Sequence, residues 1–512
     1  MKHKYLLFFL ILSLFACATD TPSVEPPVDD DNEAVVVNNT RLDAATTLYG
    51  LITDKQGNAV ANVVVTDGFT TSKTDQNGVY QLVRNRRAKF VYYSTPADCK
   101  IVVDGSNHPK FYEPLTSKDK LIRHDFTVEK QPVENEFTLF CVSDPQCRNE
   151  NELNRYKFET IPDINREAAR FDHVYAITLG DIIFDSPALW SAMKSSMAGQ
   201  AVPFFQTIGN HDHLETAENE EKAVEGFQQQ FGPTDYSFNR GDVHIISMDN
   251  VIYTGKQQYT GGFTDNQWKW LQEDLSHVSK EKMVILNTHI PFRAGGSSDH
   301  RSYHAEVLQL LSTYAEAHIM IGHTHYQINY LHKVNGKTVY EHVHGAACGA
   351  WWNSEWCADG TPNGYGVYEI EGNGMKNWYY KGTNEPADFQ MRAYDATKVF
   401  GPAGKYTYAF APNLSLTGDG WIVANIWNAD ENWDVKLFQD GVEIGTMTQR
   451  SSKDYWVLYH HLELLSKAVG STFDKSSNHF YLGRLNGKAS DANFRIEARD
   501  PFGNVYTTSE LY

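Results

Sequence analysis

The sequence predicts an α/β core that lies between two smaller β-rich modules. Short β-branched runs separated by Asn-Gly and Asp-Gly turns occupy residues 46–130, and apolar runs typical of strands alternate with helix-like runs over residues 131–384. Short runs rich in aromatic residues follow over residues 385–512. Alternating strands and helices are typical of layered α/β domains, whereas short strands joined by tight turns are typical of β-sandwiches.

The first 17 residues have the composition of a secretory signal peptide. Two lysines precede an apolar run from Tyr5 to Phe15 that is too short to span a bilayer. The run ends in Leu14-Phe15-Ala16-Cys17, which resembles the processing site of bacterial lipoproteins. We expect lipidation of Cys17 to anchor the chain in the bacterial cell envelope, at the periplasmic face or the cell surface. The alternative is an ordinary cleaved signal with an incidental cysteine.

Residues 18–45 are predicted to form a flexible tether. They are rich in Thr, Ser and Pro and contain the acidic cluster Asp29-Asp30-Asp31-Asn32-Glu33. Such a segment has too few apolar side chains to bury a core.

The module at 46–130 begins with a strand-like run at 49–54 and a turn at Gln56-Gly57-Asn58. Further runs at 60–65 and 74–80 are separated by an Asp-Gly turn. This spacing resembles the carboxypeptidase regulatory-like or transthyretin-like module, and the resemblance implies a structural β-sandwich.

The segment at 131–384 changes to the rhythm of an α/β domain. Apolar strands are expected at residues 137–142, 173–179, 202–208, 243–248, 283–286 and 319–321. Helices are expected near residues 150–170, 186–198, 217–230 and 267–271. Beyond it, strands expected at residues 421–427, 435–438 and 494–498 indicate the C-terminal β-rich module.

Five short polar segments nearly all stand where an apolar run of the core ends. They are Asp144-Pro145-Gln146, Gly180-Asp181, Gly209-Asn210-His211-Asp212, Thr288-His289 and Gly322-His323-Thr324-His325. Two divalent cations close together need about six to eight oxygen or nitrogen ligands drawn from several loops. The carboxyl edge of an α/β sheet brings such loops together, so the five segments predict a dinuclear metal site.

The order of these segments resembles the calcineurin-like metallophosphoesterase family, whose pattern is D-x-H, G-D, G-N-H-[DE], H and G-H-x-H. The resemblance covers roughly residues 136–345, and it implies a layered metallophosphoesterase core with central β-sheets flanked by helices. The sequence departs from the pattern at Gln146, where the family usually has His. A subgroup of the family carries the same Asp-Pro-Gln.

The resemblance also implies two sets of metal ligands that share one carboxylate. One cation would take Asp144, Gln146, Asp181 and His325, and the other would take Asp181, Asn210, His289 and His323. Two divalent ions (Mn, Fe, Zn or Mg) about 3.5–4 Å apart would polarise a phosphoryl oxygen and hold a hydroxide for in-line attack.

Gln146 is a neutral and harder ligand than imidazole, so it favours Mn or Mg at its position. The alternative is a weakened metal site that is filled only together with substrate.

His211 has the position of the family's catalytic histidine, which protonates the leaving oxygen or stabilises charge in the transition state. Asp212 is predicted as a second catalytic residue, and either Asp212 or Asp185 could orient the imidazole of His211. Arg293 and His213 could contact the phosphate, or they could be solvated loop residues.

Trp351 and Trp352 form an adjacent pair in a Gly-rich segment after the last metal motif. They could flank a cleft and stack on a ring of the substrate. Alternatively, they could pack the C-terminal module against the core.

We therefore expect a metal-dependent phosphomonoesterase whose partners are a phosphate-ester substrate and, through its lipid anchor, a membrane. A phosphodiesterase would use the same site, and a non-catalytic surface binding lipoprotein is the third alternative. The formal net charge of −19 disfavours nucleic acid as a partner, because phosphate contacts need clustered Lys and Arg.

Overall fold

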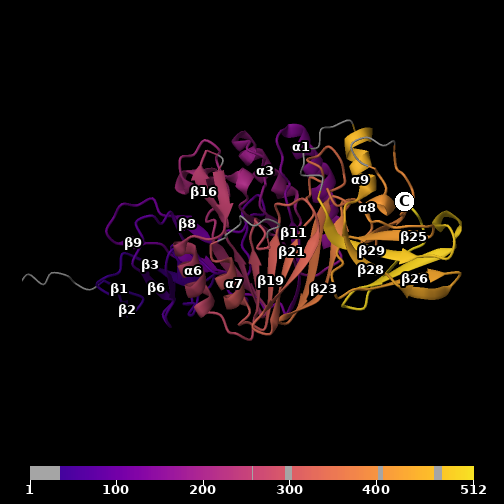
Figure 1. Cartoon of the computed structure of the whole chain (residues 1–512). Coiled ribbons are helices and arrows are strands. Elements are labelled where there is room, and N and C mark those ends of the chain that lie inside the picture. Colours follow the sequence, from indigo (N-terminus) through magenta and orange to yellow (C-terminus); the bar gives the residue numbers. More distant parts are fainter. Residues whose placement is uncertain (1–34, 257, 294–301, 402–406, 466–474) are drawn as a thin grey trace, which may run out of the picture.

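The computed structural model describes residues 35–256, 258–293, 302–401, 407–465 and 475–512. The signal peptide with Cys17 and residues 18–34 lie outside the described residues, so the predicted export and anchoring stay predictions. The end of the segment predicted as a tether differs from the prediction, because β1 (Val36–Val37) pairs with β2 (Thr40–Arg41) and Val37 and Leu42 are buried against Val79. Within the described part of the chain, no helix is both long and apolar enough to cross a membrane. Figure 1 shows the N-terminal module and the C-terminal module at opposite ends of the core.

Two mixed β-sheets form the centre of the core. The first has the spatial order β13 (Phe204–Thr207), β12 (Val174–Leu179), β11 (Glu136–Val142), β22 (Gly364–Glu371) and β23 (Gly374–Gly382). The second has the order β14 (Tyr236–Arg240), β15 (Val243–Ser247), β18 (Met283–Asn287), β19 (Glu316–Ile321), β21 (Lys337–Val343) and β20 (Ile328–Val334). Strands β11, β12 and β13 are parallel, as are β15, β18 and β19.

Alternate residues of the core strands pack into different apolar layers. Leu139 of β11 and Ile285 of β18 meet in the layer between the two sheets. Phe140 of β11 packs with the helices on the outer face of the first sheet, and Leu286 of β18 packs on the outer face of the second. Because successive side chains of a strand point to opposite faces, this division makes both sheets fully buried.

Helices cover the outer face of each sheet. The first sheet is covered by α1 (Glu150–Arg155), a π-helical turn (Tyr156–Thr160), α2 (Ile161–Ala168), α3 (Trp190–Ser196) and α5 (Glu225–Phe231). The second is covered by α6 (Asp265–Ser276) and α7 (His304–Leu311). Thr264 begins α6 with a capping box to Gln267, which satisfies backbone N–H groups of the first turn. The layered α/β core is confirmed, and α7 is a helix that the sequence did not predict.

The N-terminal module contains two four-stranded sheets. One contains β10 (Phe126–Val128), β3 (Leu48–Asp54), β6 (Val79–Leu82) and β9 (Ile122–Arg123). The other contains β5 (Thr71–Lys73), β4 (Val64–Thr66), β7 (Phe90–Tyr93) and β8 (Tyr112–Pro114). The runs expected at 60–65 and 74–80 are strands only in their last residues, because residues 60–63 have no regular structure and residues 76–77 form a turn. The resemblance to a regulatory-like module stays a prediction.

The C-terminal module also contains two four-stranded sheets, which share one apolar layer. One has the order β24 (Met391–Asp395), β25 (Trp421–Ile426), β29 (Ser477–Arg484) and β28 (Thr448–Ser452). The other has the order β27 (Val442–Thr446), β26 (Asp434–Gln439), β30 (Phe494–Arg499) and β31 (Val505–Thr508). The short helices α8 (Phe410–Asn413) and α9 (Tyr455–Tyr459) pack on the first of these sheets. The predicted β-rich ends of the molecule are thus confirmed.

A buried arginine joins the N-terminal module to the core. The side chain of Arg240, in β14, is fully buried and donates hydrogen bonds to the carbonyl oxygens of Pro96, Ala97 and Cys99. Its guanidinium lies 5.4 Å from the ring centre of Tyr175. A buried cation is stable only when its hydrogen bonds are satisfied, so the loop at 96–99 is held against the core.

We expect Arg240→Met to lower the free energy of unfolding by roughly 2–4 kcal/mol, since it leaves buried carbonyl oxygens without donors. Arg495→Met is the matched control, because the side chain of Arg495 is 44% exposed. Urea denaturation of both variants measures the difference. Equal stabilities would contradict the role assigned to Arg240.

Candidate metal centre

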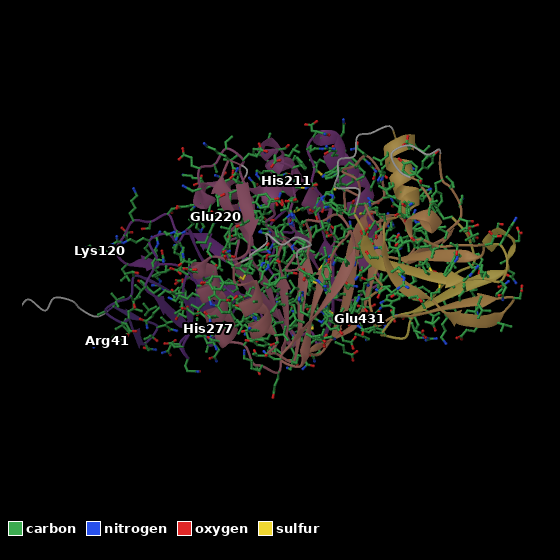
Figure 2. All side chains as sticks on the ribbon, viewed as in Figure 1. Arg41, Lys120, His211, Glu220, His277 and Glu431 are labelled. Atoms are coloured by element: carbon green, nitrogen blue, oxygen red, sulfur yellow. The ribbon has the colours of Figure 1, made fainter. Side chains whose placement is uncertain are left out.

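The five polar segments meet at one edge of the core. Asp144, Asp181 and Asn210 follow strands β11, β12 and β13 of the first sheet, whereas His289 and His323 follow β18 and β19 of the second. Figure 2 shows His211, which belongs to the same segment as Asn210, at this edge. Parallel strands end at the same edge of a sheet, so residues far apart in sequence become neighbours here.

The backbone at this edge adopts left-handed conformations that are uncommon for residues other than Gly. The φ angles are 47° at Asp144, 44° at Gln146, 52° at Asp181, 73° at His323 and 56° at His325. Each such residue costs of the order of 1 kcal/mol or more, and these conformations are typical of functional sites in which the surrounding structure holds the side chains in place.

Two glycines of the motifs are required by close approaches. A Cβ atom on Gly209 would lie 2.1 Å from the backbone nitrogen of Asp181 and 2.3 Å from its Oδ1. A Cβ atom on Gly322 would lie 2.9 Å from Oδ2 of Asp144. The Gly-Asn-His and Gly-His patterns are therefore needed for the loops to pack against the carboxylates.

Four predicted ligands converge in one group. His289 Nε2 lies 3.0 Å from Asn210 Oδ1 and 3.2 Å from Asp181 Oδ2. His323 Nδ1 lies 2.9 Å from Asn210 Oδ1 and 3.2 Å from His289 Nε2. These are the four residues that the family resemblance assigns to the second cation.

The hydrogen bonds of His289 direct a lone pair into this group. Its Nδ1 donates to the carbonyl oxygen of Leu179 at 2.8 Å, which leaves Nε2 as the atom that faces Asp181 and Asn210. A second hydrogen bond of this kind commonly orients a metal-binding imidazole. Burial alone lowers the pKa of His289, but the charge of Asp181 raises it to about 9. The group therefore favours a positive charge among its acceptor atoms.

The other predicted ligands adjoin this group at two points: Gln146 contacts Asp181, and Asp144 Oδ2 accepts from the backbone N–H of His323. Asp144 Oδ1 lies 3.5 Å from His325 Nε2 and is a buried oxygen that accepts no hydrogen bond within the described part of the chain. Gln146 donates from its side-chain Nε2 to Asp181 Oδ2 at 2.9 Å. Its Oε1 lies 4.0 Å from the sulfur of Cys348. For Gln146 to act as a metal ligand, its side-chain amide would have to flip, so that Oε1 takes the position that Nε2 has now.

The structure thus brings together all seven predicted metal ligands, here called the seven-residue cluster. They are Asp144, Gln146, Asp181, Asn210, His289, His323 and His325. That they bind cations stays a prediction, and the donor types fit it, because imidazole and carboxylate suit Zn, Fe and Mn.

His211 lies beside the seven-residue cluster and contacts two carboxylates. Its backbone N–H donates to Asp181 Oδ1 at 2.8 Å, and its ring Nδ1 lies 2.9 Å from Asp185 Oδ2. The ring stacks on Phe184 with 4.0 Å between centroids. Burial lowers the pKa of His211, but the charges of Asp181 and Asp185 raise it above its ordinary value.

Of the two carboxylates that could orient His211, Asp212 has other partners, and the catalytic role predicted for it stays a prediction. The carboxylate of Asp212 accepts hydrogen bonds from the backbone N–H groups of Ile182, Ile183 and Gly209. Burial and the charge of Asp181 raise the pKa of Asp212 to about 7. Asp212 therefore fastens one metal-site loop to another, and Asp185, the alternative, is the carboxylate that orients the imidazole.

The two tryptophans of the Gly-rich segment have different surroundings. Trp351 lies 5.1 Å from the ring of His325, at the seven-residue cluster. Trp352 is buried, and its indole N–H donates to the carbonyl oxygen of Pro145 at 2.8 Å. Trp352 thus packs against the first motif, and the substrate contact predicted for Trp351 and Trp352 stays a prediction.

Arg293 and His213 lie outside the seven-residue cluster. The guanidinium of Arg293 lies 4.9 Å from the ring centre of Tyr330. Arg293 lines a cavity of about 100 Å³ together with residues of the C-terminal module. His213 is buried, so it is not a solvated loop residue. The phosphate contact predicted for Arg293 stays a prediction.

Two aromatic residues at this site were missed by sequence reasoning. Phe184 stacks on His211, and Tyr259 lies 6.4 Å from the ring of His323 in an edge-on arrangement. Tyr259 belongs to the hairpin of β16 (Val251–Gly255) and β17 (Gln258–Gly261). Phe184 follows Asp181 closely in sequence, but no pattern in the sequence distinguishes it from a core residue.

Three family models match consecutive parts of the chain. The N terminal of calcineurin-like phosphoesterase matches residues 46–131, calcineurin-like phosphoesterase matches residues 137–327, and the C terminal of calcineurin-like phosphoesterase matches residues 341–506. No curated protein matches the chain.

Among solved structures, purple acid phosphatase PPD1 from yellow lupin (Lupinus luteus) seeds is similar with a TM-score of 0.36 and 14% identity, over 49% of this chain and 52% of that chain. Sulfate thiohydrolase SoxB from Thermus thermophilus is similar with a TM-score of 0.29 and 11% identity, over 49% of this chain and 57% of that chain. The chain therefore spans little more than half of the length of either protein.

We expect Asp212→Ala to lower the free energy of unfolding by roughly 2–4 kcal/mol, because three buried N–H groups lose their acceptor. Asp185→Ala should lower it by less than about 1 kcal/mol, since the Asp185 side chain is 20% exposed and holds one imidazole. Urea denaturation measures both. A larger loss for Asp185→Ala than for Asp212→Ala would reverse the two assignments.

Proposed function

The chain belongs to the calcineurin-like phosphoesterases, and from this premise we propose that it is a phosphomonoesterase with a dinuclear metal centre. As a member of this family it is a metal-dependent phosphoester hydrolase. The observation that carries the proposal is the convergence of the seven-residue cluster at the edge of both core sheets. Among the described residues, Asp181, His289 and His323 also form a group whose ligand atoms lie within 4.8 Å of one another.

The residues fit a pair of cations that share Asp181. The buried acceptor Asp144 Oδ1 faces His325, which supports a first cation held by Asp144, Gln146, Asp181 and His325. The lone pairs of His289 and His323 and the amide oxygen of Asn210 support a second. Imidazole and carboxylate together suit Zn, Fe or Mn, and the amide of Gln146 favours Mn or Mg at the first position.

When bound, divalent cations polarise a phosphoryl oxygen and lower the pKa of water. The residues of the chain provide orientation. Leu179 holds the ring of His289, and Ser143 donates a hydrogen bond to the carboxylate of Asp144. These buried contacts keep the ligands in place before substrate arrives, so less reorganisation is required during the reaction.

His211 is proposed as the acid that protonates the leaving oxygen. Asp185 accepts from Nδ1 and Phe184 packs on the ring face, so the orientation of the imidazole is defined. Nε2 is then the atom left to give a proton to the leaving group. The side chain of His211 is 26% exposed, which is compatible with access for a substrate.

The aromatic residues beside the histidines of the site support a phosphate monoester, which has one organic group, as the substrate. Phe184 contacts His211, Tyr259 contacts His323 and Trp351 contacts His325. Three rings from three segments therefore lie beside three histidines of the site, and in this proposal they would contact the single organic group of a monoester. A diester would need space for two such groups at the same edge.

We expect metal-free protein to regain hydrolysis of p-nitrophenyl phosphate when titrated with Mn, Zn, Fe or Mg, and to hydrolyse bis-p-nitrophenyl phosphate more slowly. Asn210→Ala should lower kcat/KM by about 100-fold or more, because residues that only orient a metal ligand already contribute about 10–100-fold. Steady-state kinetics with each metal measures both effects.

Faster hydrolysis of the diester would replace the proposed monoesterase with a phosphodiesterase. Wild-type rates in Asn210→Ala would show that Asn210 is not a ligand. Gln146→His is the variant that tests the first position, and it should shift the preferred metal from Mn or Mg towards Zn.

We expect His211→Ala to slow hydrolysis of an alkyl phosphate about 10²–10⁴-fold, the range typical of general acid catalysis. The loss should be much smaller for p-nitrophenyl phosphate, whose leaving group needs no proton. The rates of wild type and variant on both substrates measure this difference. An equal loss on both substrates would assign His211 to charge stabilisation in place of proton transfer.

A further inference from the structure

A second group of ligand-type side chains lies outside the seven-residue cluster. Its members are His213, Glu220 and Asp249, here called the His213 trio, and one ligand atom of each lies within 4.8 Å of the other two. His213 follows the Gly209–Asp212 segment, Glu220 begins α4 (Glu220–Ala223), and Asp249 lies between β15 and β16.

The hydrogen bonds of His213 leave its ring nitrogen Nε2 facing only acceptor atoms. Nδ1 lies 2.8 Å from the carbonyl oxygen of Gly209, so it carries the proton. Nε2 lies 3.2 Å from Asp249 Oδ2 and 3.5 Å from Glu220 Oε1. A lone pair and two carboxylate oxygens repel one another, so a proton or a cation must lie among them.

The lengths of these contacts favour a cation. Hydrogen bonds between charged nitrogen and oxygen atoms are about 2.7–2.9 Å long. Two ligand atoms bound to one tetrahedral zinc ion at about 2.0–2.2 Å lie about 3.3–3.6 Å apart. The 3.2 and 3.5 Å distances of the His213 trio are closer to the second range.

Other histidine–carboxylate pairs of the same chain separate into the same two classes. Pairs with a buried imidazole elsewhere in the described chain have short contacts, namely His244–Asp274 at 2.8 Å, His318–Glu316 at 2.7 Å and His479–Asp359 at 2.9 Å. Pairs inside the seven-residue cluster have long contacts, namely His289–Asp181 at 3.2 Å and His325–Asp144 at 3.5 Å. The His213 trio has the spacing of metal ligands, not that of hydrogen-bonded pairs.

The carboxylates of the trio are held so that one oxygen of each remains for the shared position. Asp249 Oδ1 accepts from the backbone N–H of Val251 at 2.9 Å. Glu220 Oε2 accepts from the backbone N–H of Tyr253 at 2.7 Å. The ring of Tyr253 stacks on His213 with 5.8 Å between centroids. Such contacts orient side chains around a metal in known sites.

The balance of charge at the His213 trio also favours a divalent cation over a proton. A protonated His213 with two ionised carboxylates would leave a net negative charge beside an imidazole and an Asp249 side chain that are almost fully buried, whereas the Glu220 side chain is 37% exposed. Burial and the charge of Asp249 also raise the pKa of Glu220. A divalent cation with a neutral imidazole would balance both carboxylates. Burial lowers the pKa of His213 and the two carboxylates raise it well above its ordinary value, so an imidazolium is the competing occupant.

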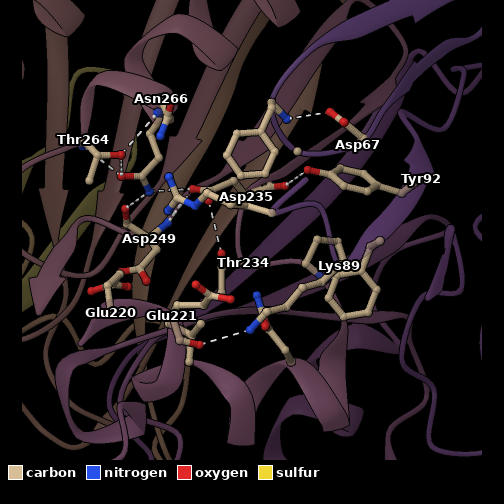
Figure 3. Close-up of a pocket in the computed structure, with 18 of the residues that line it drawn as sticks. Asp67, Lys89, Tyr92, Glu220, Glu221, Thr234, Asp235, Asp249, Thr264 and Asn266 are labelled. Atoms are coloured by element: carbon tan, nitrogen blue, oxygen red, sulfur yellow. Dashed lines mark hydrogen bonds between the residues drawn. The ribbon is translucent and has the colours of Figure 1, made fainter. Parts of the chain in front are cut away.

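We propose that His213, Glu220 and Asp249 bind a further divalent cation of the zinc class, separate from the dinuclear centre. One imidazole and two carboxylates are a ligand set that suits zinc, and its remaining position would be filled by water. Glu220 and Asp249 line a cavity of about 170 Å³ between the N-terminal module and the core. Figure 3 shows both residues at one end of this cavity.

The cation would have a structural role. It would tie the segment that ends at His213 to α4 and to the start of the β16–β17 hairpin. Gly209, whose carbonyl oxygen holds His213, directly precedes Asn210 and His211. Tyr259 of the hairpin lies against His323, so the same cation would brace the site from two sides.

The test is the amount of zinc bound per chain after metal-free protein is saturated with Zn²⁺ and desalted, measured by mass spectrometry of the metal. Glu220→Gln should lower bound zinc by about one ion per chain. Glu221→Gln is the matched control, because Glu221 is the next residue and lines the same cavity. It should bind as much zinc as the wild type.

A second arm removes the dinuclear centre by combining Asp181→Ala with His289→Ala. This variant should retain about one zinc ion per chain, and Zn²⁺ should raise its Tm, because a ligand that binds the folded state stabilises it. Adding Glu220→Gln should abolish the rise in Tm. If the combined variant fails to fold, anomalous diffraction from zinc-soaked wild-type crystals replaces it, with a peak expected about 2.0–2.2 Å from His213 Nε2.

Equal zinc content in Glu220→Gln and Glu221→Gln, or no anomalous peak beside His213, would overturn the inference and assign the position to a proton. These outcomes do not depend on hydrolysis. If wild-type protein binds zinc at the trio but hydrolyses neither ester, the proposed function fails and the inference about the trio stands.

Discussion

The carboxylate of Asp181 is the contact on which the rest of the site depends. Its Oδ1 accepts from the backbone N–H of His211, and its Oδ2 faces both His289 and Gln146. Its backbone oxygen accepts from the backbone N–H of Gln146 at 2.8 Å. One buried residue thus connects loops from both core sheets. Burial raises the pKa of Asp181, but the charges of His289 and His211 lower it below its ordinary value, so the carboxylate stays ionised.

The loops keep this arrangement because the layers beneath them are rigid. The two sheets share one apolar layer and each has a second layer under its helices, so the strand ends have fixed relative positions. Gly209 allows its loop to approach Asp181. Asp212 of the same loop accepts a hydrogen bond from the backbone N–H of Ile182 and so fastens it to the Asp181 loop. The left-handed backbone of Asp181 and His323 is tolerated only because these contacts hold it.

The C-terminal module extends the same support to the last metal motif. Asp359 accepts from the backbone N–H of Gln327 and lies 2.9 Å from His479 of β29. Asn425 of β25 donates to the carbonyl oxygen of Asp359. Ala358, the preceding residue, donates to the carbonyl oxygen of His325 at 3.4 Å. The module therefore contacts the site through buried hydrogen bonds, which gives a physical reason for its place in the chain.

Local patterns in the sequence predicted the layered core well, because a buried strand such as β11 is a continuous apolar run and a helix such as α6 has bulky residues at helical spacing. The N-terminal strands were placed less well, since β4 and β6 are short and the turns beside them have similar composition. Helix α7 is only eight residues long, and a short apolar run of this kind is not distinguished from a buried strand by periodicity alone.

The sequence by itself determined which residues reach the edge of the core. Asp144, Asp181, Asn210, His289 and His323 each follow a strand, and the order of strands and ligands can be read along the chain. Only the tertiary structure decided which of these side chains meet.

The carboxylate that contacts the His211 ring belongs to Asp185, although Asp212 directly follows His211 in sequence. His213 contacts Asp249, which lies 36 residues further along the chain. Such pairings depend on how two sheets and their loops pack in space. Sequence spacing alone does not specify the distance between side chains on different strands.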